Sequence, residues 1–229
     1  MALINRNTLS TFDWFLIAGV IASSLGYSFL TSSFDTLGII ASITGVVCVV
    51  LCAKGNILNY AFGLVNVTIY AWISFKAQLY GDAALNALYY FPMNIIGWLS
   101  WNNRRQIADE TKVKARRMTP GQRVLLTGVC VVTVAVCGII LSKVGDPQPY
   151  KDSATTMLSI IAMFLMVRAF MEQWALWILT NVISVAMWII LTVRGDSHAV
   201  MMVIMYVFYT INSINGLVQW KKLAANDVE

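Results

Sequence analysis

Long apolar stretches separated by short polar breaks run along nearly the whole chain. A helix needs about 20 mostly apolar residues to cross the hydrocarbon layer of a membrane, and eight stretches come close to that length. These stretches are 12–32, 36–53, 57–79, 83–101, 123–142, 155–173, 175–193 and 198–220. The pattern predicts an all-α membrane protein with eight transmembrane helices. The first stretch lacks a small-residue cleavage site, so it is expected to be a retained helix rather than a signal peptide.

The polar breaks contain residues that favour turns. Those at 54–56, 80–82 and 194–197 each hold a glycine with Asn or Asp beside it. Gly and Asp at such places favour tight helical hairpins. The sixth and seventh stretches nearly touch, and Glu172 with Gln173 is predicted to form the turn between them.

The segment 174–220 resembles the earlier segment 59–101. Moving the first forward by about 115 positions superimposes aromatic, amide and glycine residues in the same order. The matched pairs are Phe62 with Trp177, Asn66 with Asn181, Tyr90 with Tyr209, Gly97 with Gly216 and Trp101 with Trp220. Their common order inside two apolar segments of similar length indicates an internal duplication.

The duplication predicts a 3+1+3 arrangement of parallel three-helix repeats behind an extra N-terminal helix. A three-helix unit begins and ends on opposite membrane faces, and one connecting helix then lets the second unit start from the same face. The predicted parts are 1–34 (extra helix), 35–103 (first repeat), 104–154 (cytoplasmic loop and connecting helix) and 155–229 (second repeat and C-terminal tail). Transporters built from such repeats bind substrate near the bilayer midplane between the halves.

Composition excludes a water-soluble globular protein. The 229 residues are 59% hydrophobic and 12% charged, whereas soluble domains are about a quarter charged. The net charge of +5 does not indicate nucleic-acid binding, because seven of the 16 Lys and Arg residues lie in the single loop 102–123. The positive-inside rule places that loop, and both termini, in the cytoplasm. The four cysteines lie within apolar stretches without CxxC spacing, which favours a packing role over a metal or redox role.

Amide and aromatic side chains recur at helical spacing in the third, fourth, seventh and eighth stretches. Residues three or four apart share a helix face, so these side chains are expected to line a substrate path. The candidate binding residues are Asn66, Tyr90, Asn94, Trp98, Trp177, Asn181, Trp188, Tyr209, Asn212 and Asn215. The alternative is that the amides join helices by hydrogen bonds. Trp101 and Trp220 are interpreted as interfacial belt residues, and Arg168 is expected to pair with Glu172 or to reach the cytoplasmic interface.

This inventory favours a neutral or singly cationic ligand with hydroxyl groups and a planar ring, such as a nucleoside. Amides donate and accept hydrogen bonds, and aromatic faces stack on rings or on a delocalised cation such as a pyridinium. No Asp, Glu or His lies in the middle of a stretch, and no phosphate-binding loop, nucleophile–base pair or metal-ligand cluster is evident. We therefore expect a carrier without a cofactor that works by facilitated diffusion, rather than an enzyme. A sodium site made of carbonyl and hydroxyl groups would leave no recognisable pattern in the sequence, so sodium coupling is left as an alternative.

Several motifs resemble the PnuC family of vitamin transporters, which has a SWEET-like helix arrangement. They are GLVNVTIYAWISFKAQLYGD at 63–82, YYFPMNIIGWLSWNN at 89–103, NVISVAMWIILTVRGD at 181–196 and YTINSINGLVQWKK at 209–222. The resemblance covers residues 36–222. It implies uptake of nicotinamide riboside across the bacterial inner membrane without ion coupling, with phosphorylation by a cytoplasmic riboside kinase trapping the substrate.

The alternatives to this interpretation fall into two classes. Within transport, relatives of the PnuC family carry thiamine, riboflavin or deoxynucleosides, and a SWEET-like sugar carrier fits the helix pattern as well. Outside transport, a membrane-embedded enzyme or a receptor would use the same helices without solute flux. Homo-oligomerisation is compatible with the sequence but is not indicated by any motif.

Overall fold

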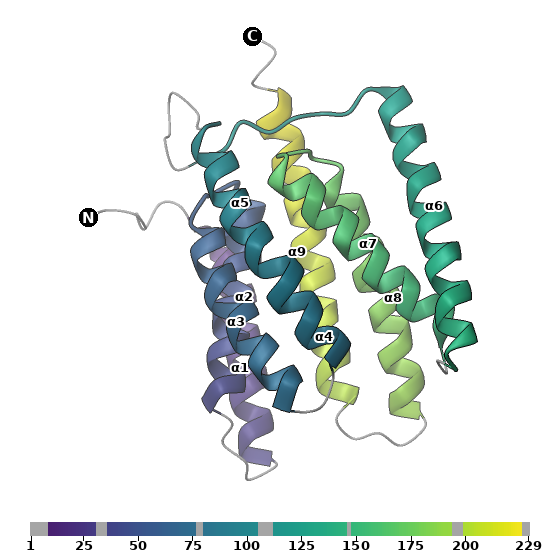
Figure 1. Ribbon diagram of the computed structural model, residues 1–229. Coiled ribbons are helices and arrows are strands. Elements are labelled where there is room, and N and C mark those ends of the chain that lie inside the picture. The colour runs from purple at the N-terminus through teal and green to yellow at the C-terminus, as the bar shows by residue number, and fades with distance from the viewer. Residues whose placement is uncertain are drawn as a thin grey trace. The chain divides into compact units, whose positions relative to one another are not determined.

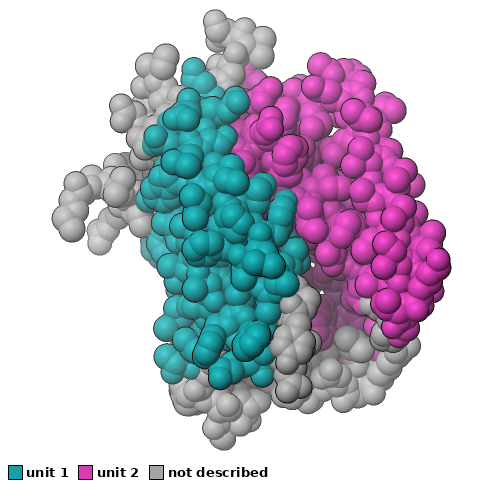
Figure 2. Space-filling model, in the orientation of Figure 1, with its two compact units in different colours: residues 1–114 teal, residues 115–229 magenta. Residues whose placement is uncertain are grey.

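The computed structural model describes residues 9–30, 36–76, 80–104, 112–145, 148–193 and 199–225. Every regular element in these ranges is a helix. The chain divides into two compact units, residues Met1–Lys114 and Ala115–Glu229, which are coloured separately in Figure 2. This division reflects packing within each half of the chain, and the four-part division proposed from the sequence stays a prediction.

The first unit contains three long helices and one composite helix. The three long helices are α1 (Thr11–Leu30), α2 (Thr36–Ala53) and α3 (Asn59–Lys76). The composite helix consists of α4 (Tyr80–Ala84), a π-helical turn η1 (Leu85–Tyr90) and α5 (Phe91–Asn102). Figure 1 labels all of these elements except η1. Helix α2 packs against α1 and α3, and α3 packs against the composite helix. The π-helical turn is followed by Pro92 in the first turn of α5, where a missing backbone N–H is tolerated.

The second unit contains four helices, each packed against the next one in sequence. They are α6 (Pro120–Lys143), α7 (Pro149–Val167), α8 (Gln173–Val193) and α9 (Ala199–Ala225). Helix α6 begins with a capping box, because the Thr119 hydroxyl accepts from the Gln122 N–H and the Gln122 amide oxygen accepts from the Thr119 N–H.

Each of the eight predicted stretches contains a described helix. Gly81 and Asp82, however, were predicted to form a turn and instead lie in α4, where Asp82 occupies the first helical turn that favours a negative charge. The corresponding prediction for Gly195 and Asp196 lies outside the described residues. Three helices in the described part, Thr36–Ala53, Pro120–Lys143 and Gln173–Ile190, are long and apolar enough by length and composition to cross a membrane.

Within the first unit, a buried ion pair joins helix α1 to the turn that follows α2. The Asp13 carboxylate is fully buried, and one of its oxygens lies 2.8 Å from Lys54 Nζ, in the turn that follows α2. The same oxygen accepts from the backbone N–H and the hydroxyl of Ser10, which precedes the helix. These bonds compensate part of the cost of burying the charge, so they fix the start of α1 against the α2–α3 turn.

The turns after α2 and after α7 have the same backbone geometry. Gly55 and Ala169 both adopt left-handed conformations, with φ of 66° and 58°. In each turn the next residue donates to the carbonyl five positions earlier, Asn56 to Leu51 and Phe170 to Leu165. This is the Schellman motif. It places the second turn at residues 168–172, slightly before the predicted Glu172–Gln173.

The linker before α6 pairs with both turns. In the first unit, the Val113 N–H donates to the Gly55 carbonyl at 2.9 Å. In the second unit, the Arg116 N–H donates to the Ala169 carbonyl at 2.7 Å, and the Arg116 carbonyl accepts from Met171 at 2.9 Å. Val113 and Ala115 are buried, so this part of the linker is an ordered element of each unit.

We expect Gly55→Ala to lower the free energy of unfolding by about 1–2 kcal/mol, since a left-handed backbone costs a residue with a Cβ about that much. Ala169 occupies the equivalent turn, which indicates that alanine can adopt this conformation and limits the expected loss. The measurement is thermal unfolding of the purified protein in detergent. Gly121→Ala, in α6 where a Cβ meets no atom within 4 Å, is the control. Equal melting temperatures for the two variants would contradict the assignment of a strained turn.

Candidate functional site

A glycine lies beneath an aromatic ring in each unit, where a side chain would clash. A Cβ added to Gly97 would lie 2.3 Å from the Tyr60 ring, and one added to Gly216 would lie 2.6 Å from the Trp174 ring. These glycines therefore permit close helix approach.

Each of these rings also meets a tryptophan at the end of the unit. Trp101 packs edge-on against Tyr60 with ring centroids 4.9 Å apart, and Trp220 packs edge-on against Trp174 at 6.2 Å. Both tryptophans are fully buried. The interpretation of Trp101 and Trp220 as interfacial belt residues is therefore wrong, because their rings are covered by partners on neighbouring helices.

The matching turns align the two segments with an offset of 114 positions, whereas the pairing of Asn66 with Asn181 predicted from the sequence used an offset of 115. Gly55 and Ala169 are 114 positions apart, as are the helix starts Asn59 and Gln173. In this register Asn66 corresponds to Thr180 rather than to Asn181. One residue changes the direction of a side chain by about 100° around a helix, so the predicted Asn66–Asn181 correspondence does not hold.

In the first unit, the predicted amides make hydrogen bonds to helix backbone. Asn66 Nδ2 donates to the Ala41 carbonyl at 2.7 Å and so joins α3 to α2. Asn94 is buried, and its Nδ2 donates to the Tyr90 carbonyl at 2.8 Å. The Asn94 amide oxygen packs closely against Gly63, where a Cβ would clash with it. Tyr90 and Trp98 are half-buried.

In the second unit, a buried polar seam joins α8 to α9. Asn181 Nδ2 donates to the Ser213 hydroxyl at 3.1 Å, and both side chains are buried. Asn212 lies next to Ser213 and is also buried. The seam therefore joins the predicted residue Asn181 on α8 to Ser213 on α9, which directly follows the predicted residue Asn212 in sequence.

The remaining predicted residues of the second unit are less enclosed. Trp188, Tyr209 and Asn215 are half-buried, and the Tyr209 ring packs edge-on against Tyr206. Trp177 packs against the buried apolar cluster that α6, α7 and α8 form. Part of the Trp177 ring is thus used in helix packing.

Two buried polar atoms beside the seam have no hydrogen-bond partner within the described ranges. They are the Thr180 hydroxyl on α8 and Asn215 Nδ2 on α9. A buried donor without a partner costs about 1–3 kcal/mol, so such atoms are candidates for contact with a solute or water. Amide, hydroxyl and aromatic groups of this kind bind polar, uncharged groups and flat rings.

Sequence reasoning missed a second group of buried polar side chains at the starts of α3 and α8. Gln173 is fully buried with both amide atoms unpartnered among the described residues, as is the indole N–H of Trp174. At the equivalent positions of α3, the Asn59 amide oxygen and the Tyr60 hydroxyl are also buried without a hydrogen-bond partner among the described residues. Aligning the two segments with an offset of 114 positions would have shown an amide followed by an aromatic residue in both, Asn59–Tyr60 and Gln173–Trp174.

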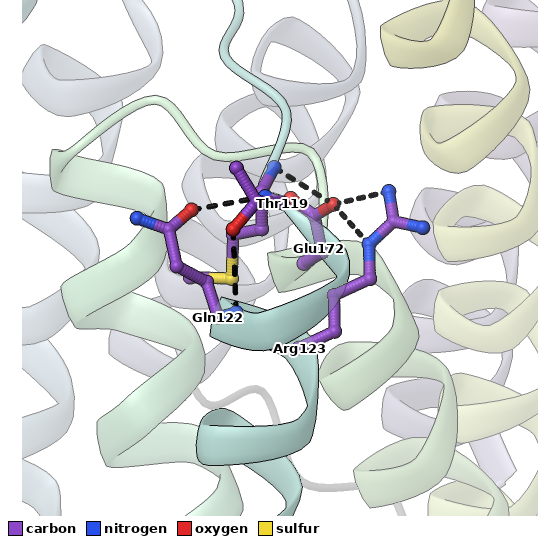
Figure 3. A network of polar contacts seen from close by, with 5 residues as sticks. Thr119, Gln122, Arg123 and Glu172 are labelled. Atoms are coloured by element: carbon purple, nitrogen blue, oxygen red, sulfur yellow. Dashed lines mark hydrogen bonds and ion pairs between the residues drawn. The ribbon is translucent and has the colours of Figure 1, made fainter.

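Charged side chains of the described helices lie in their first or last two turns. Glu172 does not pair with Arg168, which was one of the two alternatives predicted for Arg168, and the other, a position at the cytoplasmic interface, stays a prediction. Its Oε1 accepts from Arg123 Nε at 3.0 Å, from Arg123 Nη2 at 2.8 Å and from the Met118 N–H at 3.1 Å, as Figure 3 shows around the start of α6. Arg168 is exposed and lies over the Phe164 ring. The described residues contain no group of His, Cys, Asp and Glu that could hold a metal ion.

Comparison with known proteins places most of the chain in one family. Residues 35–222 match the family described as Nicotinamide mononucleotide transporter. The nicotinamide riboside transporter PnuC of Neisseria mucosa is 36% identical over 190 residues, which cover 82% of this chain and 72% of the relative. PnuC of Escherichia coli is 31% identical over 206 residues, covering 79% and 83%. The predicted resemblance to the PnuC family is confirmed.

A more distant relative and a solved structure complete the comparison. The riboflavin/roseoflavin transporter RibM of Streptomyces davaonensis is 29% identical over 116 residues, covering 49% of this chain and 53% of the relative. The crystal structure of the vitamin B3 transporter PnuC is similar to this chain with a TM-score of 0.78 and 33% identity, covering 95% of this chain and 94% of that one.

Proposed function

This chain belongs to the nicotinamide mononucleotide transporter family, and we propose on that basis that it carries nicotinamide riboside through a membrane by facilitated diffusion. The observation that carries the proposal is the 36% identity over 190 residues to a nicotinamide riboside transporter. The relatives are transporters rather than enzymes, which is consistent with a carrier. Riboside kinase activity in the cytoplasm would then trap the substrate and maintain its inward gradient.

The proposed binding residues are the ten named from the sequence, with the α8–α9 seam as the best-supported part. Amides at Asn181, Asn212 and Asn215 are assigned to the ribose hydroxyls and the carboxamide, because these groups need both donors and acceptors. Aromatic rings such as Trp188 and Tyr209 are assigned to the pyridinium, which is attracted to ring faces. In the first unit, Asn66, Tyr90, Asn94 and Trp98 remain the proposed substrate-contacting residues.

The proposed membrane arrangement has eight spans, with parallel triplets and with both termini in the cytoplasm of a bacterial cell. The described helices within all eight predicted stretches support it, and so do the matching Schellman turns and glycine–ring contacts of the two units. Passive transport is favoured because proton-coupled carriers usually place an ionisable residue within the membrane. The charged residues of the described helices lie near helix ends instead.

Titration calorimetry on the purified protein tests the substrate. The panel is nicotinamide riboside, nicotinamide mononucleotide, thiamine, riboflavin and glucose. We expect the riboside to bind most tightly. The mononucleotide should bind more weakly, because its phosphate would enter an amide- and ring-lined site without a compensating cation. Tighter binding of the mononucleotide or of glucose would contradict the proposal.

Riboflavin is the second candidate substrate, since the RibM relative matches about half of the chain. A planar isoalloxazine ring with a polyol tail would use the same aromatic and amide groups. If riboflavin is the best ligand of the panel, the family assignment holds and the choice of substrate changes.

A further inference from the structure

An apolar groove of about 710 Å³ lies in the second unit, lined by residues of α6, α7, α8 and α9. Its walls are aliphatic, with Leu126 and Val131 from α6, Leu158 from α7, and Leu179 and Ile183 from α8. Several of these side chains are exposed, including Val131 and Leu179. Amide-bearing candidates for the riboside site do not line the groove, so it is separate from the α8–α9 seam.

One end of the groove is cationic. Arg117, Arg123 and Lys221 line it there, together with the single carboxylate of Glu172. Arg123 is held in place by its two hydrogen bonds to Glu172 Oε1 (Figure 3), whereas Arg117 and Lys221 are exposed. Three cations against one carboxylate leave two net positive charges beside an apolar wall.

The length of the groove corresponds to one membrane leaflet. From Arg123 to Val134, both of which line it, the chain advances 11 residues along α6, or about 16 Å at 1.5 Å per residue. This is about half of the roughly 30 Å hydrocarbon thickness of a bilayer. A ligand with a charged head and a hydrocarbon tail of one leaflet's depth therefore fits both the polarity and the length.

We propose that this groove binds an anionic glycerophospholipid, with an acyl chain against the aliphatic walls and the phosphate between Arg117, Arg123 and Lys221. Basic pockets between membrane helices on the cytoplasmic side recognise anionic lipid headgroups, and the positive-inside rule places this end of α6 in the cytoplasm. A zwitterionic lipid would gain the same apolar contacts but less from the cations. The lipid would join α6 to α8 across a gap that protein side chains leave open.

The test is native mass spectrometry of the whole protein, purified after reconstitution in phosphatidylethanolamine vesicles that contain phosphatidylglycerol. We expect one retained phosphatidylglycerol per chain in preference to phosphatidylethanolamine. Arg117→Gln and Lys221→Gln should each weaken retention about fivefold, since a basic residue near an anionic lipid surface contributes about that factor. Lys222→Gln is the charge control, because Lys222 is adjacent to Lys221 but does not line the groove.

Two tryptophan substitutions on α6, one in the groove lining and one beside it, test the role of the apolar wall. Val131→Trp fills the groove and should abolish retention, whereas Val132→Trp, one residue along α6 and not part of the lining, should leave it unchanged. The two valines are similarly exposed, at 63% and 59%. Riboside binding is measured for every variant to establish that each is folded.

Two results would overturn the proposal. One is equal retention of the two lipids, or retention that does not differ between the Val131 and Val132 variants. The other is a change of oligomeric mass in Val131→Trp without a change in lipid, which would mean that a second copy of the chain covers the groove. Neither result bears on riboside transport, which is measured separately.

Discussion

Gly216→Ala and Gly97→Ala are each expected to lower the free energy of unfolding by about 1–3 kcal/mol, the usual range for overpacking a buried contact. The added methyl group would lie 2.6 Å from Trp174 in the first case and 2.3 Å from Tyr60 in the second. Neither ring can move easily, because Tyr60 is fully buried, Trp174 is nearly so, and each packs against a buried tryptophan. The measurement is the melting temperature of the purified protein in detergent.

Gly128→Ala is the control for this pair of substitutions. Gly128 lies within α6, and a Cβ there meets no atom within 4 Å. Alanine has the higher helix propensity, by about 1 kcal/mol, so this variant should be as stable as the parent or more stable. If Gly216→Ala melts at the same temperature as Gly128→Ala, the close approach of α8 and α9 described above is incorrect.

The second large effect is expected on riboside binding. Trp188→Ala should weaken it about tenfold or more, because a ring face contributes up to about 2 kcal/mol to a desolvated cation. Folded yield should change little, since Trp188 is only half-buried. Trp72→Ala, which removes an exposed tryptophan of α3, is the control and should bind the riboside like the parent. Calorimetry with the riboside measures both variants.

Asn181→Ala should weaken riboside binding by a similar factor, but it also removes the hydrogen bond to Ser213. Ser213→Ala removes the same hydrogen bond while it leaves the amide in place, so the two variants separate a binding role from a structural one. We expect Ser213→Ala to retain most of the binding affinity. Equal losses in the two variants would mean that Asn181 only joins α8 to α9.

The helices could be predicted from the sequence because their signal is long and local. Every predicted stretch contains a described helix, since a run of apolar residues of that length has few other stable conformations in a membrane. The role of the glycines was also predictable. Gly97 and Gly216 lie in helix interiors, where a small residue usually marks close helix approach.

The surroundings of individual side chains could not be predicted, because they depend on residues far away in the sequence. Trp101 and Trp220 stand beside polar residues at helix ends, which is typical of interfacial belts, yet both are buried by rings about 40 to 46 positions away. Glu172 pairs with Arg123, 49 positions away, rather than with Arg168 one turn before it. Local spacing carries no information about such pairs.

The candidate site stays a prediction, and the structure bears on it only through the positions of its amides. Several amides lie in buried or half-buried helix contacts, in agreement with a polar stripe inside the bundle. The match of Asn66 with Asn181 was off by one residue, because an apolar helix offers several plausible registers. The left-handed residues Gly55 and Ala169 fix the register. A left-handed conformation is rarely adopted by alanine, so the sequence gives no sign of it at Ala169.

Counterflow in proteoliposomes tests the central claim most directly. Vesicles loaded with unlabelled nicotinamide riboside are diluted into buffer containing radiolabelled riboside, with the same ions on both sides and ionophores present to remove any ion gradient. A passive carrier should accumulate label transiently inside the vesicles, and Trp188→Ala should reduce the rate. Absence of accumulation until a sodium or proton gradient is restored would contradict the account.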